Sequence, residues 1–266
     1  MATSTRNVIV GAANLFISNK NGANRPTTTP SDIASLLAKA GSKGVSARTN
    51  INGALDSNGS QVYREVGFTS TGMEISYEPN YGEVMVDQLL DAARLFKQTL
   101  KVTLKTELVE ATLENLTTSW GQSDFYIDSN GAPVYSLNQL TTGSIAATGT
   151  TTAQLNIAAG AVGDTPVERV LIAVGSAPRT IGGSYSAATD DAGHDGDVTG
   201  NTSDLKQKER VYIARRVVNI DTTAHGLKRD AATVFPVNFR CLPDDTDSSY
   251  AGAEYGVVID RVWGTI

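Results

Sequence analysis

The acidic segment around residue 195 holds the pattern most similar to a metal site in this sequence. Asp195, Asp197, Thr199 and Gly200 repeat the start of a calcium loop, D-x-D-x-x-G, in which alternate oxygen atoms and a turn glycine wrap a hard cation. A complete loop closes with an acidic side chain at its twelfth position, where this chain has Lys206. The pattern therefore favours a solvated acidic loop over a calcium site, and we expect no bound metal.

The residues that could support hydrolysis lack the context that a catalytic site needs. His194 and His225 are the two histidines, and both lie in polar segments. A hydrolytic triad needs a nucleophile on a tight turn, and no G-x-S-x-G motif occurs. Ser203 and Lys206 match S-x-x-K by spacing alone. A Walker glycine loop, a dinucleotide fingerprint, paired cysteines and an H-E-x-x-H helix are also missing. We therefore expect a protein that is not an enzyme and has no cofactor.

Glu110 and Glu114 are four residues apart at the start of a predicted helix and could form a pair of carboxylates. Acidic residues are also favoured in a first helical turn by the helix dipole, and this structural explanation is preferred. The helix has one apolar stripe at i, i+3 and i+7, formed by Leu113, Leu116 and Trp120. These three residues are the predicted core anchors of the helix.

The stretch from residue 81 to 121 contains the elements that would position these side chains. It predicts a short strand, an amphipathic run over 88–97, an alternating strand over 99–108 and the helix, which Gly121 can end in a left-handed conformation. The alternating strand divides its side chains between two faces, as a half-buried strand does. One face carries Leu100, Val102, Leu104, Thr106 and Leu108, and the other carries Lys101, Thr103, Lys105 and Glu107.

The composition limits the classes of partner. Hydrophobic residues make up 40% of the 266 residues, enough for a substantial core, and charged residues make up 19%. This balance is common in β-rich assembly proteins and in many secreted proteins. The formal net charge of −6 argues against a protein that grips nucleic acid, because phosphate binding needs clustered lysine and arginine. If DNA is a partner, it is repelled or passed along.

The single cysteine and the N-terminal sequence indicate the compartment. Cys241 can form no intrachain disulfide and is predicted to be a small core residue on the strand that contains Phe235 and Phe239. The first residues lack the layout of a signal peptide, and no apolar run reaches about 18 residues. We expect synthesis and folding in a cytosol, with no membrane partner.

Alternating and apolar runs predict a mainly β fold of sandwich or barrel type, with one packed helix and long loops. Predicted strands cover 8–17, 62–77, 99–108, 169–174, 208–221, 230–242 and the final YGVVIDRVW. Pro79 is expected to end the second of these strands. Pro236 is expected at an edge, at a bulge or where another subunit meets the sheet. No repeat or linker divides the chain, so one domain over 1–266 is expected.

Two long polar segments interrupt this pattern, a loop over 18–60 and an insertion over 175–205. Within the first, TPSDIASLLAKAG predicts a short helix with an apolar stripe of Ile33, Leu36 and Leu37. Such a stripe could pack on the core of its own chain or on a neighbouring subunit, and physical reasoning leaves both open. The insertion is acidic and is expected to be exposed.

Several segments together resemble the major tail tube proteins of long-tailed bacteriophages. They are VGFTSTGMEISYEP (66–79), the run E-x-x-x-D-Q that starts at Glu83, and L-x-E-A-T-L-E-N-L from Leu108 closed by Gly121. FPVNF, LPDD and YGVVID near the C-terminus fit more loosely. The order and spacing of the segments carry the resemblance.

The resemblance implies six subunits in a ring, each giving strands to an inter-subunit β-barrel, with rings stacked into the hollow tail of a virion made in a bacterial cytoplasm. It implies contacts with a tape measure protein, a tail terminator and a distal tail protein, and passage of double-stranded DNA without specific binding. The loop with Ile33, Leu36 and Leu37 becomes the candidate ring-to-ring contact. Glu74, Glu78, Glu83 and Asp87 become candidates for an acidic wall of the lumen, where Lys101 and Lys105 would need pairing or another orientation.

Two other classes stay open. Another ring component of the virion, a tail terminator or connector, would share the fold and stop at a single ring. A β-sandwich carbohydrate-binding protein would need an exposed aromatic cluster, and aromatic residues make up only 6% of this chain.

Overall fold

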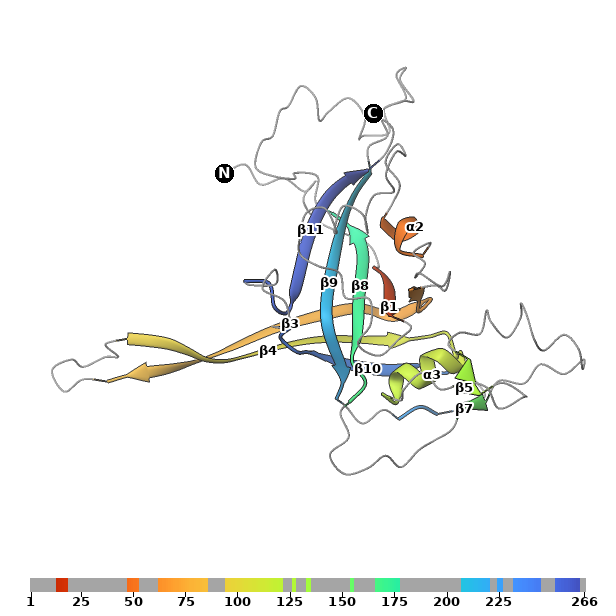
Figure 1. Ribbon diagram of the computed structural model, residues 1–266, viewed down its shortest axis with the longest axis horizontal. Helices are drawn as coiled ribbons and strands as arrows, with labels where there is room; N and C mark the ends of the chain where they lie inside the picture. The colour runs from red at the N-terminus through yellow and green to blue at the C-terminus, as the bar shows by residue number, and fades with distance from the viewer. Residues whose placement is uncertain are drawn as a thin grey trace, which may run out of the picture.

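The structure is a computed structural model that describes residues 13–18, 47–52, 62–85, 94–121, 126–127, 133–134, 154–155, 166–177, 207–220, 224–226, 232–244 and 252–263. Within these residues the fold is mainly β, with one antiparallel eight-stranded sheet, as Figure 1 shows. The strands of this sheet are β1 (Asn14–Ser18), β2 (Tyr63–Glu65), β3 (Thr69–Val84), β4 (Arg94–Leu108), β8 (Arg169–Ser176), β9 (Gln207–Asn219), β10 (Phe235–Cys241) and β11 (Gly256–Trp263). A small sheet contains β5 (Tyr126–Ile127), β6 (Pro133–Val134) and β7 (Gln154–Leu155), and the helices are α2 (Ala47–Asn52) and α3 (Leu113–Ser119).

Strand β9 joins two parts of the large sheet. One edge of β9 pairs with β8, while its other edge pairs with β11 over Gln207–Ala214 and with β10 over Val217–Asn219. The first part contains β2, β1, β8, β9 and β11, and the second part contains β10, β4 and β3. The two parts run in steeply different directions (Figure 1). The expected mainly β fold is confirmed, and the described strands form a bent open sheet that does not close into a barrel.

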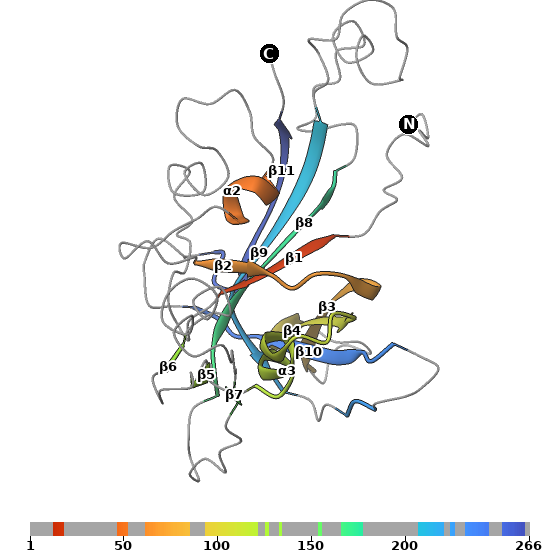
Figure 2. The ribbon, with the colours of Figure 1, turned by 90° about the vertical axis from the view of Figure 1, so that its right-hand side faces the viewer.

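Among the described residues, the core consists of two apolar clusters on opposite faces of the first part. Alternate residues of β1 and β8 enter different clusters, so that Ile17 and Leu171 face β4 and β10, while Phe16 and Ile172 pack with α2. Figure 2 shows α2 beside the first part and α3 beside β10 and β4. Because both faces of β8 are covered, the residues that follow Arg169 in its run RVLIAV can all be apolar, as predicted for a buried strand. Cys241 is buried in the first cluster, as predicted, and burial raises the pKa of its thiol to about 12.

The alternation predicted for β4 is confirmed over the half that touches the core. Leu104, Thr106 and Leu108 are buried, and Lys101 and Lys105 are exposed. Thr103 is the exception, since it is buried although it belongs to the polar face.

The expected end of the strand at Pro79 is wrong, because β3 continues through this residue to Val84. Since β3 is the last strand of the described sheet, a residue without an N–H can be accommodated on its unpaired edge. The last residues of the amphipathic run, 94–97, belong to β4. Pro236 pairs with Glu107 of β4, and no described strand pairs with its other side. This agrees with an edge position, one of the three alternatives expected for it.

An ion pair links β11 to β9. Arg210 donates two hydrogen bonds to the Asp260 carboxylate, from Nε at 2.5 Å and from Nη2 at 2.7 Å. These bonds hold the pKa of Asp260 below its usual range although burial opposes them. The pKa of this carboxylate in the unfolded chain is about 3.9, and above that pH the ionised carboxylate stabilises the fold fully. The stabilisation is lost as the pH falls through the lower pKa that Asp260 has in the folded state.

We therefore expect Asp260→Asn to lower the free energy of unfolding by about 1–2 kcal/mol at pH 7, since both side chains are about three-quarters buried and keep some solvent screening. Urea unfolding across a pH series measures this difference. The difference should shrink between pH 4 and the folded pKa of Asp260. A difference that stays constant down to the acid limit would contradict the assignment of the carboxylate.

Candidate interaction surface on the β3–β4 hairpin

The outer part of the β3–β4 hairpin, residues 77–84 and 94–102, extends beyond the rest of the sheet, and we call it the arm. Figure 1 shows the arm projecting to the left of the other strands. In β4 every residue from Arg94 to Thr99 is exposed, whereas the half near Leu108 is largely buried. The hairpin is thus anchored at one end in the core and free of the described body at the other.

One face of the arm continues the apolar face of the core. Tyr77 pairs with Val102 and lies two residues beyond Ile75, which pairs with the buried Leu104. Alternation along β3 places Tyr81 on the same face. On this face Tyr77 is 61% exposed and Tyr81 is 55% exposed. The apolar face of the core therefore continues along the arm, where its tyrosine side chains are largely uncovered by the described residues.

A β-bulge keeps Leu95 on that apolar face. Asn80 pairs with Thr99, but Tyr81 pairs with Lys97, so Gln98 is an extra residue in β4. The Lys97 Nζ donates to the Tyr77 hydroxyl at 3.2 Å, which places Lys97 on the apolar face. Leu95, two residues away, shares this face and is 59% exposed.

Gly82 allows close packing on the other face near the tip. A Cβ atom at Gly82 would lie 2.7 Å from the ring of its cross-strand partner Phe96 and 2.4 Å from the Gln98 amide nitrogen. Phe96 covers the glycine and is itself 45% exposed. The tip of the arm therefore presents apolar side chains on both faces.

The polar face of the hairpin carries opposite charges in register. Glu78 pairs with Lys101 across the ladder, and their charged atoms lie 3.9 Å apart. Glu74 stands opposite Lys105 in the same way. The sequence indicated that these two lysines would need partners, and the register provides a glutamate for each. Glu83 is exposed too, but alternation places it on the apolar face.

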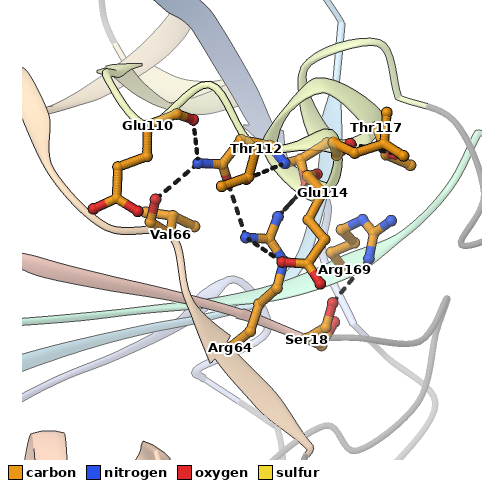
Figure 3. Close-up of polar contacts among 11 residues, drawn as sticks. Ser18, Arg64, Val66, Glu110, Thr112, Glu114, Thr117 and Arg169 are labelled. Carbon is orange, nitrogen blue, oxygen red and sulfur yellow. Dashed lines mark hydrogen bonds and ion pairs between the residues drawn. The ribbon is translucent and has the colours of Figure 1, made fainter. Parts of the chain in front are cut away.

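The base of the hairpin is held by the buried side chain of Asn115 in α3. Figure 3 shows this region, with Arg64, Val66 and Glu110 labelled. Its Nδ2 donates to the Val66 carbonyl at 2.8 Å, just before β3, and to the Glu110 carbonyl at 2.9 Å, just after β4. Arg64 of β2 donates to Asn115 Oδ1 at 2.8 Å and to Thr118 Oγ1 at 2.8 Å. This polar cluster, which we call the clamp, ties both ends of the hairpin to the helix and to β2.

Helix α3 differs from its prediction at its start and on its buried face. Thr112 is the N-cap and its side chain accepts from the Asn115 N–H, so Glu110 lies before the helix and forms no pair with Glu114 in the first turn. Gly121 has φ +63°, which confirms the left-handed end.

The buried positions of α3 are polar, namely Asn115, Thr117, Thr118 and Ser119. The predicted anchors Leu113, Leu116 and Trp120 are half-buried. Leu116 packs against the core, and the Trp120 ring lies 5.9 Å from that of His225, which contacts Phe235 edge-on. The sequence analysis did not predict the clamp. The one feature of the sequence that could have indicated it is the asparagine inside a short predicted helix.

Several candidate residues lie outside the described part of the chain. They are the stripe Ile33, Leu36 and Leu37, the wall candidate Asp87, and the acidic segment with His194, Asp195 and Asp197. Among the residues that the structure does describe, no cluster of His, Cys, Asp and Glu could hold a metal ion. Within the same residues, no helix has the length and apolar character needed to cross a membrane.

A scan against models of protein families found no match to this chain, and a search of curated proteins found none either.

Proposed function

We propose that this chain is a structural virion protein, the major tail tube subunit of a long-tailed bacteriophage. The observation that carries the proposal is the arm, whose apolar face continues the core and is uncovered within the described residues. The resemblance of residues 66–79, 83–88 and 108–121 to tail tube proteins supplies the identity of the assembly.

The arm needs a partner for two physical reasons. Exposed apolar side chains gain roughly 25 cal/mol for each Å² removed from water. In addition, β3 is a 16-residue strand at the edge of the described sheet, and a long unpaired edge is an aggregation hazard unless another strand or subunit covers it. A second copy of this chain can satisfy both needs. If the arm of one copy contacts a different surface of the next copy, the contact is head-to-tail, and such contacts can close into a ring.

In the proposed tube each subunit gives strands to a continuous inter-subunit barrel. Rings of six stack into a hollow tail in the virion, and double-stranded DNA passes through the lumen without specific binding. A tape measure protein, a tail terminator and a distal tail protein are the further partners that the resemblance implies. The role needs no catalytic residue and no cofactor.

Negative-stain electron microscopy of the purified chain over a concentration series tests the proposal. Hollow tubes or stacked six-fold rings are the expected result. Isolated rings that never stack would favour the alternative of a tail terminator or connector. A compact monomer that binds sugar would exclude the structural role.

The candidate ring-to-ring contact provides a second test. Leu36→Asp is expected to leave the chain folded and to prevent tube growth, because a charge would enter the apolar stripe of Ile33, Leu36 and Leu37. Microscopy and circular dichroism measure the two properties, and Ser35→Asp serves as a charge-matched control off the stripe. Normal tubes from Leu36→Asp would remove the 18–60 loop from the proposed contact.

A further inference from the structure

We infer that Pro79 divides the uncovered edge of β3 into two short segments and so prevents folded copies of this chain from pairing edge to edge along it. No described strand pairs with the outer side of β3, although the strand spans 16 residues. A long open edge is a template for another strand, and in a solution of this protein that strand comes from a second copy. The inference concerns the unassembled chain and does not rest on the proposed function.

Hydrogen bonds show toward which neighbouring strand the main chain of β4 points at each residue. On β10 the Asn238 carbonyl accepts from the Ile220 N–H at 3.2 Å, so the main chain of Asn238 points away from β4. Opposite residues in an antiparallel pair either bond to each other or both point away, so Lys105, the partner of Asn238, points toward β3. Successive residues of a strand point to alternate edges, so Leu100 points away from β3. Its carbonyl accepts from the Tyr255 hydroxyl at 3.4 Å, in agreement with this direction.

The nitrogen of Pro79 therefore lies on the uncovered edge of β3. Pro79 pairs with Leu100, and because the main chain of Leu100 points away from β3, that of Pro79 points away from β4. An incoming strand would find no N–H donor at this position and would meet the proline ring instead. Pro236 of β10 is placed in the same way, since its partner Glu107 points toward β3 as Lys105 does. Both prolines in the described strands of the large sheet thus have their nitrogen on a side that no described strand covers.

The rest of this edge is suited to accept a strand. From Met73 to Val84 the pairing of β3 with β4 shifts once, where the extra residue Gln98 lies in β4, so β3 itself alternates regularly. Charge protects the edge little, since Glu74 and Glu78 each stand opposite a lysine of β4. Without Pro79 a strand could pair along the whole of 73–84. Pro79 leaves the segments 73–78 and 80–84, each of which offers only a short ladder.

Pro79→Thr restores the missing N–H and is expected to let folded copies associate. The monomeric full-length chain is kept below the concentration at which the wild type assembles, and thioflavin T fluorescence and light scattering follow its aggregation. The variant should aggregate at least about tenfold faster than the wild type and give thioflavin-positive aggregates. Its fold should be preserved, with a Tm lowered by no more than about 4 °C, because proline also restricts the unfolded chain.

Asn80→Thr is the matched control, because the main chain of Asn80, the residue after Pro79, points toward β4. It introduces the same side chain without a new donor on the edge, so it should aggregate at the wild-type rate. A second comparison moves the proline along the edge to Tyr77, whose main chain points outward as that of Pro79 does. Pro79→Thr with Tyr77→Pro should regain the wild-type rate, whereas Pro79→Thr with Tyr77→Thr should still aggregate quickly.

Aggregation of Pro79→Thr at the rate of the wild type or of Asn80→Thr would overturn the inference. Equal rates for the two double variants would also overturn it, because the missing N–H would then not be what protects the edge. So would a Tm lowered by more than about 4 °C in Pro79→Thr, which would assign Pro79 to the stability of the fold. Tube formation has no part in these measurements, so absence of both tubes and rings would reject the proposed function alone.

Discussion

Leu95→Asp is expected to abolish assembly of the chain and leave its fold unchanged. Leu95 lies on the apolar face of the arm and is 59% exposed. Replacing it with a polar residue should therefore change the free energy of unfolding of the monomer by no more than about 0.5 kcal/mol. In an assembly this face is covered, and the substitution then removes an apolar contact and buries a charge without a partner, at a cost of several kcal/mol. Because each subunit repeats the contact, the critical concentration for assembly should rise by well over about tenfold. Sedimentation and negative-stain microscopy over a concentration series measure it.

Thr99→Asp is the matched control for Leu95→Asp. Thr99 is exposed on the same strand of the arm, but it belongs to the polar face. Both variants add one negative charge, so a general electrostatic effect would weaken assembly equally in both. We expect Thr99→Asp to assemble at nearly the wild-type concentration. Equal behaviour of the two variants, or normal assembly of Leu95→Asp, would show that the apolar face of the arm is not the contact.

The sequence predicted those parts of the fold where burial follows a local period. The alternation in β4 indicates that one face of the strand is buried, and the apolar run of β8 indicates that both faces are buried. Both strands could therefore be predicted from neighbouring residues. Gly121 was predictable too, because its left-handed conformation depends on local geometry.

The arm was not predictable, because its features depend on pairing between distant residues. A proline in a strand pattern usually marks the end of the strand. Pro79 is compatible with a strand that continues to Val84 only because β3 lies at the edge of the described sheet. The extra residue Gln98 shifts the alternation in β4, so that Leu95 and the neighbouring residues read as an amphipathic run. The charge pairing of Glu78 with Lys101 requires the register of the hairpin.

The clamp was missed for a related reason, since a polar residue in a short helix normally predicts exposure. Asn115 is 1% exposed because its amide satisfies two carbonyl groups, and its own oxygen accepts from Arg64. Only the three-dimensional meeting of β2, the two ends of the hairpin and α3 makes that burial favourable. The clamp therefore links the stability of the body to the orientation of the arm.

Asn115→Leu is expected to be the most destabilising of the substitutions considered for the described residues. Leucine has a similar size but no hydrogen-bonding group, so the carbonyls of Val66 and Glu110 and the guanidinium of Arg64 each lose a partner. An unsatisfied buried polar group costs about 1–3 kcal/mol, and the sum here should reach about 3–5 kcal/mol. For a domain of this size that corresponds to a Tm lowered by roughly 10 °C. Calorimetry and urea unfolding measure both quantities.

Asn80→Leu makes the same substitution at an exposed residue of β3 and should change the Tm by no more than about 2 °C. Hydrogen exchange then distinguishes a role of Asn115 in holding the hairpin ends together from a general role in core packing. The Val109 N–H donates to the Phe68 carbonyl at 2.9 Å across the base of the hairpin. If Asn115 holds the two ends of the hairpin together, this amide should lose protection in Asn115→Leu more than the amides of β8 do. Uniform loss of protection would assign Asn115 to the general core, and an unchanged Tm would show that the clamp does not stabilise the fold.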